Sequence, residues 1–171
     1  MADVFLFDTN IATAVWNTRD KYHEQAHSYL SNLGGINANT IKISVVTLAE
    51  VRCGLRTAQN MPDEQRTAVQ DAMDRYPVVL PITEHTAEYY SKIRSKLFID
   101  HSPRNERGRL TRRWVEDLTD STTEKSLGIQ TNDIWIAAQA MEKNLVLVTA
   151  DQMRHIASLQ LNPGLRIVYW R

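Results

Sequence analysis

The hydrophobic pattern of this chain alternates between short apolar runs and longer amphipathic segments. The apolar runs span residues 4–7, 41–46, 78–82, 145–148 and 165–170. They are rich in Val, Ile and Phe and lack polar alternation, so they fit strands that are covered on both faces. Between them, apolar residues recur at helical spacing in the segments 26–33, 68–76, 87–97 and 134–141. This alternation predicts an α/β fold with a central, mostly parallel β-sheet sandwiched by α-helices.

Composition narrows the class of protein. A chain of 171 residues can bury one core without disulfides, so we expect a single domain over residues 1–171. There is one cysteine, Cys53, and no apolar run approaches the ~20 residues of a membrane helix, which favours a soluble, cytoplasmic protein that does not bind membranes. Basic and acidic side chains number 20 each, so any affinity for nucleic acid must come from local charge.

Four acidic residues stand where predicted strands end or predicted helices begin. Asp8 closes VFLFD, Glu50 lies in SVVTLAEV, Asp133 opens TNDIWIAAQA, and Asp151 follows LVLVTA. Because the carboxyl ends of parallel strands meet at one edge of a sheet, we expect the four carboxylates to gather there. Each acid also has a structural alternative. Thr47 and Glu50 have the spacing of a capping box, and the other three acids could cap or charge a helix start.

Clustered carboxylates favour a cation. Two like charges ~4 Å apart repel by about 4 kcal/mol at an effective dielectric constant of about 20, so four together would be costly without a counter-ion. Magnesium and manganese are hard cations that prefer oxygen ligands. The sequence therefore predicts a Mg²⁺ or Mn²⁺ site made by Asp8, Glu50, Asp133 and Asp151.

Four segments resemble the PIN-domain family, and within it the VapC toxin ribonucleases of type II toxin–antitoxin pairs. They read FLFDTN, VVTLAEVRCGL, VVLPITEHTAEYYSKIRSKL and GIQTNDIWIAAQAMEKNLVLVTAD. The resemblance implies a PIN-like fold and a metal-dependent endoribonuclease that hydrolyses RNA and so inhibits translation. It assigns catalytic and metal-binding roles to Asp8, Glu50, Asp133 and Asp151. It also implies that Asn10 and Thr149 orient the ligands, that a protein antitoxin neutralises the toxin, and that the chain forms a homodimer.

Two features depart from the family pattern. Many relatives follow the last acid with another acid and a phenylalanine, whereas this chain continues Asp151-Gln152-Met153-Arg154. Relatives also reach the Asp133 motif through a short connection. Here that connection is long and charged, which predicts an insertion around residues 99–126.

The inserted region is also locally basic. Residues 92–113 hold eight Lys or Arg against two acids, and Trp114 follows. Basic residues beside an aromatic suit contacts with phosphates and bases, although a solvated charged surface is the simpler alternative. We predict RNA contacts from Arg104, Arg107, Arg109, Arg112 and Arg113.

Other functions are possible from the sequence. A non-catalytic PIN-like module that binds RNA or acts as a scaffold needs no active site. Residues His23-Glu24-Gln25-Ala26-His27 spell HExxH, the motif of zinc metalloproteases, but no motif for a third ligand follows. A phosphatase of the haloacid dehalogenase type would need an acid where this chain has Asn10.

Overall fold

Five strands form one sheet in the order β3-β2-β1-β4-β5. In this computed structural model, which describes residues 3–32, 40–75, 79–151 and 153–171, strands β1 to β5 span Phe5–Phe7, Ile41–Ser44, Val79–Leu80, Val146–Thr149 and Arg166–Tyr169. Strand β1 pairs in parallel with β2 and β4, and β2 pairs in parallel with β3. The predicted α/β class with a mostly parallel sheet is therefore confirmed. Residues 33, 76 and 78 of the predicted segments lie outside the described residues.

The helices divide between two compact units of the chain. The first unit comprises Met1–Ile82, Leu145–Asp151 and Ile167–Arg171, and the second comprises Thr83–Asn144 and Gln152–Arg166. In the first unit, α1 to α4 span Thr9–Trp16, His23–Asn32, Val45–Thr57 and Asp63–Asp74. In the second, α5, a 3-10 helix, α6 and α7 span Glu84–His101, Val115–Asp117, Thr131–Glu142 and Arg154–Ala157. No helix among the described residues is long and apolar enough to cross a bilayer.

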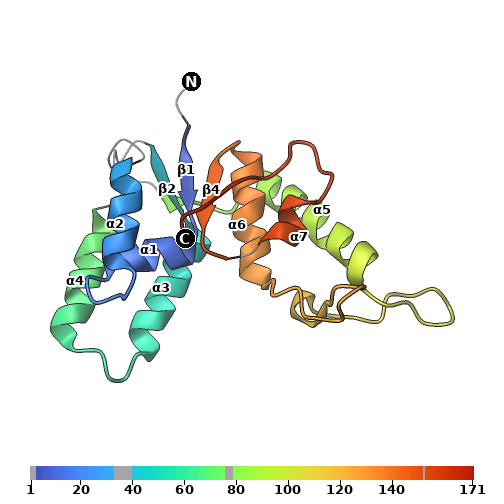
Figure 1. Cartoon of the computed structure of the whole chain (residues 1–171), viewed down its shortest axis with the longest axis horizontal. Coiled ribbons are helices and arrows are strands. Elements are labelled where there is room, and N and C mark those ends of the chain that lie inside the picture. The colour runs from blue at the N-terminus through green and yellow to red at the C-terminus, as the bar shows by residue number, and fades with distance from the viewer. Residues whose placement is uncertain (1–2, 33–39, 76–78, 152) are drawn as a thin grey trace. The chain divides into compact units, whose positions relative to one another are not determined.

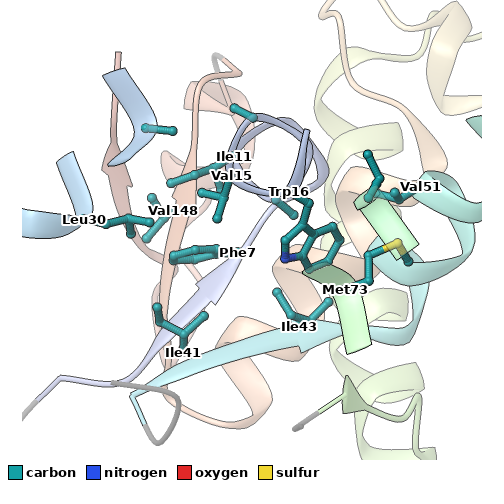
Figure 2. Packing of buried hydrophobic residues seen from close by; sticks show 14 of the residues in the cluster. Phe7, Ile11, Val15, Trp16, Leu30, Ile41, Ile43, Val51, Met73 and Val148 are labelled. Atoms are coloured by element: carbon teal, nitrogen blue, oxygen red, sulfur yellow. The ribbon is translucent and has the colours of Figure 1, made fainter. Parts of the chain in front are cut away.

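The core of the first unit lies between the sheet and helices α1 to α4, which gather beside the strands (Figure 1). Phe7 of β1 stands in register with Ile43 of β2 and Val148 of β4, and all three are buried. Ile11 and Trp16 of α1 complete this layer (Figure 2). Fully burying side chains of this size contributes about 1.5–3 kcal/mol each, so the layer fixes β1, and the residues that follow it, in place.

The second unit has its own core. Ile93 and Leu97 of α5 pack in one cluster with Ile134 of α6, and Val115 and Leu118 join them. The last two belong to the segment predicted as a charged insertion, so part of that segment is anchored by buried apolar side chains. Its arginine-rich part, before Val115, is exposed.

The junction of β2 and α3 differs from the sequence prediction. The apolar run 41–46 predicted a strand, but β2 ends at Ser44 and α3 begins at Val45. The Ser44 hydroxyl accepts a hydrogen bond from the Val46 amide at 3.0 Å, which caps the helix. The capping-box alternative for Thr47 and Glu50 therefore does not hold. Thr47 is buried and donates its hydroxyl to the Phe7 carbonyl at 3.3 Å, which ties α3 to the end of β1.

Candidate active site

Asp8 lies at the carboxyl end of the central strand β1. Its amide donates to the Val148 carbonyl at 3.0 Å, which extends the pairing with β4 by one residue. Its Oδ1 accepts from the Thr9 amide at 2.7 Å and caps α1, so the helix-capping alternative is true of this residue. The side chain is only 3 % exposed. The other oxygen, Oδ2, points into a polar network.

Asn10 joins two of the predicted carboxylates. Its Nδ2 lies 2.8 Å from Asp8 Oδ2, 3.0 Å from Asp151 Oδ2 and 3.0 Å from the Thr149 hydroxyl. The Thr149 hydroxyl donates to Asp8 Oδ2 and accepts from the Asp151 amide at 3.0 Å. The amide and the hydroxyl thus hold Asp8 and Asp151 side by side. That Asn10 and Thr149 orient metal ligands stays a prediction.

The orientation of the Asn10 amide is fixed from its other end. Its Oδ1 accepts from the Ala150 amide and from Trp170 Nε1, both at 2.9 Å. Because two donors meet at Oδ1, the Nδ2 group must face the carboxylates. Trp170 is 5 % exposed and follows β5. Sequence reasoning missed its role. The only signal was the tryptophan that ends the last apolar run, residues 165–170.

Glu50 enters the site from α3. It receives a hydrogen bond from the Thr9 hydroxyl, so α3 is joined to the start of α1. Thr9 is a second residue that the sequence analysis did not assign. We call Asp8, Glu50 and Asp151 the acidic cluster. All three belong to the first unit, and each comes from a different segment of the chain.

Electrostatics in the acidic cluster oppose the charged form of Asp8. The pKa of Asp8 is raised from 3.8 to about 6; burial is the largest cause, and the charges of Asp151 and Glu50 also raise it. The hydrogen bonds from Thr149 and Thr9 lower the pKa and offset part of the effect. A pKa change of one unit corresponds to about 1.36 kcal/mol. The ionised carboxylate is therefore held at a cost that a nearby positive charge would remove.

Asp133 belongs to the second unit. Its Oδ2 accepts from the Gln130 amide at 2.7 Å, and it forms a capping box with Gln130 at the start of α6. The structural alternative thus holds for Asp133 too. Its convergence with the acidic cluster stays a prediction.

The donor chemistry of the acidic cluster suits a hard cation. All of its side-chain donors are carboxylate oxygens, which Mg²⁺ and Mn²⁺ prefer. Within the described parts of the chain, no group of three or more His, Cys, Asp or Glu side chains is arranged to hold a metal ion. In the acidic cluster the oxygens are hydrogen-bonded to Thr9, Asn10 and Thr149. Cation binding would therefore require these donors to give up or share their contacts.

The histidines of the HExxH motif pack against each other, and His23 contacts α1. The motif begins α2, and His23 Nδ1 lies 2.9 Å from the Ala14 carbonyl oxygen. The rings of His23 and His27 lie with their centroids 4.4 Å apart. One imidazole nitrogen is thus taken by a contact with α1, and the helix buries Ala26 and Leu30. The motif joins α2 to the core of the first unit.

The basic segment forms an ordered turn in the second unit. Arg104 and Leu110 make an antiparallel bridge, and Asn105 Oδ1 accepts from the amides of Arg107 and Arg109 at 3.0 Å each. Gly108 has φ of 71°, which glycine adopts without strain. All five predicted arginines are exposed, and Trp114 is 61 % exposed.

Comparisons with solved structures agree with this fold. The chain is similar to VapBC2 from Rickettsia felis bound to a promoter DNA fragment, at 21 % identity and a TM-score of 0.64, covering 98 % of this chain and 99 % of that one. DNA-bound VapBC from Salmonella typhimurium matches at 21 % identity and a TM-score of 0.60, covering 99 % of both chains. FitAcB from Neisseria gonorrhoeae matches at 20 % identity and a TM-score of 0.60, covering 96 % of both. Among curated proteins, no sequence matches.

The family comparison covers most of the chain. The PIN domain model matches residues 5–158, a range that includes all four predicted acidic positions. Together with the parallel sheet and the polar network beyond β1, this match shows that the chain belongs to the PIN domain family.

Proposed function

We propose that this protein is a metal-dependent endoribonuclease that hydrolyses RNA phosphodiester bonds. The observation that carries the proposal is the buried Asp8, joined through Asn10 to Asp151 and lying beside Glu50, in a chain of the PIN domain family. A helix cap alone does not need a second and a third carboxylate next to the first. The charges of the second and third carboxylates oppose ionisation of Asp8, and a bound cation would compensate these charges.

Asp8, Glu50 and Asp151, together with Asp133, are the residues that would hold Mg²⁺ or Mn²⁺. Such an ion, when bound, lowers the pKa of a water molecule and stabilises charge on the phosphate oxygens. The chain itself supplies order. Asn10 and Thr149 keep the Asp8 carboxylate turned toward Asp151, and the buried layer below Asp8 prevents it from moving.

The reaction that the family resemblance implies is hydrolysis without a covalent enzyme intermediate. Oxygen from water forms a bond to phosphorus, and the bond from phosphorus to the 3′ oxygen breaks. A proton from the water ends on the leaving oxygen, so the products carry a 5′ phosphate and a 3′ hydroxyl. The exposed arginines of the turn at residues 104–113 are proposed to contact the RNA backbone.

Cleavage of a mixed RNA with and without EDTA tests the activity. We expect Mg²⁺ or Mn²⁺ to support cleavage, EDTA to stop it, and Asp8→Asn to abolish it. Asp74→Asn is the matched control, because it removes one carboxylate charge from an exposed position at the end of α4. RNA binding without cleavage in the wild-type protein would instead favour the non-catalytic module.

We further propose that the protein is the toxin of a toxin–antitoxin pair in the cytoplasm. Similar solved structures are VapBC and FitAB assemblies. By analogy, a small antitoxin would neutralise this chain, which we expect to form a homodimer. Induced expression without antitoxin should then arrest growth and protein synthesis. The Asp8→Asn variant should be tolerated. If the wild-type protein and the Asp8→Asn variant both arrest growth, the toxicity does not depend on the acidic cluster.

A further inference from the structure

Aromatic and cationic side chains gather beside the Asn10 amide in the first unit. The Trp170 ring, whose Nε1 donates to Asn10, meets the Tyr22 ring edge-on with centroids 6.2 Å apart. Over the Tyr22 ring lie two cations. The Arg171 guanidinium carbon is 3.9 Å from the ring centroid, and the Lys21 ammonium is 4.7 Å from it. Two positive charges are thus linked to the acidic cluster through Tyr22, Trp170 and Asn10.

The aromatic rings place these cations. Trp170 is buried, and its amide donates to the Thr149 carbonyl at 3.1 Å, so its ring is fixed relative to the site. Tyr22 is held at the start of α2, where its amide donates to Asp20 Oδ1 at 2.8 Å. Lys21 lowers the pKa of the Tyr22 hydroxyl through a hydrogen bond and its charge. Both cations are therefore drawn to a ring that is itself anchored.

Lys21 and Arg171 belong to none of the ion pairs found among the described residues. Both side chains are exposed, so an anion from solution can reach them. An RNA strand that approaches the acidic cluster is repelled by its carboxylates. A pair of cations linked to the cluster through Tyr22, Trp170 and Asn10 would offset that repulsion on the approach to the cluster.

We propose that Lys21 and Arg171 form a phosphate-binding subsite that holds the backbone of single-stranded RNA beside the acidic cluster. This inference rests on the proposed nuclease function and adds to it the part of the substrate that is held. The Tyr22 ring already contacts two cations and Trp170, which leaves little ring surface on which a base can stack. The subsite therefore recognises phosphate, and its contribution does not depend on the base.

Fluorescence anisotropy with labelled oligouridylate and oligoadenylate tests the subsite in the full chain, with EDTA present to prevent cleavage. Arg171→Glu and Lys21→Glu should each raise Kd by about tenfold and make the salt dependence of log K shallower by about 0.7, the value for one lost phosphate contact to a single strand. Arg171→Lys should keep most of the affinity. The effects should be equal for the two RNAs. Arg75→Glu, an exposed residue that follows α4, makes the same change in net charge and should have a much smaller effect.

Each outcome decides the inference. If Arg75→Glu weakens binding as much as Arg171→Glu, or if neither subsite variant changes Kd, the subsite is refuted. Competition by an oligoglutamate peptide as strong as that by RNA would also refute it, and would favour an acidic protein partner. The nuclease proposal is judged separately from cleavage by the wild-type protein in Mg²⁺. Binding that depends on Arg171 without any cleavage would support the subsite and remove the nuclease.

Discussion

Replacing Asp8 by Asn tests whether the acidic cluster is electrostatically strained in the metal-free protein. Burial and the charges of Asp151 and Glu50 raise the pKa of Asp8 from 3.8 to about 6. Well below pH 3.8 the carboxyl group is protonated in both the folded and the unfolded chain. As the pH rises toward 6, the unfolded chain ionises first, so the folded state loses stability. Above pH 6 the loss is complete.

The size of this loss follows from the difference between the two pKa values. At about 1.36 kcal/mol per pKa unit, the full loss is ~3 kcal/mol, and about 2.4 kcal/mol of it falls between pH 4 and neutral pH, because the unfolded chain is already partly ionised at pH 4. The Asp8→Asn protein has no titrating group at this position and should not show this loss. The substitution also disturbs the hydrogen bonds from Thr149 and Asn10, at about 1–3 kcal/mol. The loss of these hydrogen bonds does not depend on pH. The difference in free energy of unfolding between the wild-type and Asp8→Asn proteins should therefore vary with pH only because of the Asp8 charge.

The assay is urea unfolding in EDTA at about pH 4 and about pH 7.5. Between these values, the free energy of unfolding of the wild-type protein should fall by about 2.4 kcal/mol relative to Asp8→Asn, equal to about 5–10 °C in Tm for a chain of this size. Asp74→Asn should follow the wild type, since Asp74 is exposed. Adding Mg²⁺ at neutral pH should stabilise the wild-type protein more than Asp8→Asn. Identical pH dependence in wild type and Asp8→Asn would refute the reasoning.

Three further substitutions test the site and its support. Trp170→Phe keeps an aromatic ring but removes the donor that orients Asn10, so kcat for RNA cleavage should fall about tenfold with KM little changed. A change in KM alone would contradict the role of Trp170 in positioning Asn10. Phe7→Ala should lower the free energy of unfolding by about 3–5 kcal/mol in urea titrations, because it leaves a cavity beneath Asp8, and a loss under 1 kcal/mol would show that the layer collapses to fill it. A triple variant that replaces Arg109, Arg112 and Arg113 of the basic turn with Glu should weaken RNA binding and make its salt dependence shallower. An unchanged salt titration would exclude the turn from RNA contact.

The secondary structure was largely readable from the sequence, and its errors have local causes. Predominantly apolar runs predicted all five strands. The expected burial on both faces suits β1, β2 and β4, whereas β3 and β5 are half-buried or exposed along their length, so for those two strands the expectation was wrong. The end of β2 was misplaced because Val45 and Val46 have the β-branched or apolar character of a strand. There the capping hydroxyl of Ser44 decides where the helix begins, and a serine within an apolar run gives a weak signal.

The sequence by itself determined the succession of strands and helices and predicted where carboxylates would gather, because acids at the ends of buried strands have few positions to occupy in a parallel sheet. The tertiary structure decided how they are held. The orientation of Asn10 depends on Trp170, which is 160 residues away in the chain, and the contact of Glu50 depends on the Thr9 hydroxyl. The rise in the pKa of Asp8 likewise depends on burial and on charges from other segments. Hydrogen-bond direction and desolvation arise only when distant segments meet, so no local pattern in the sequence records them.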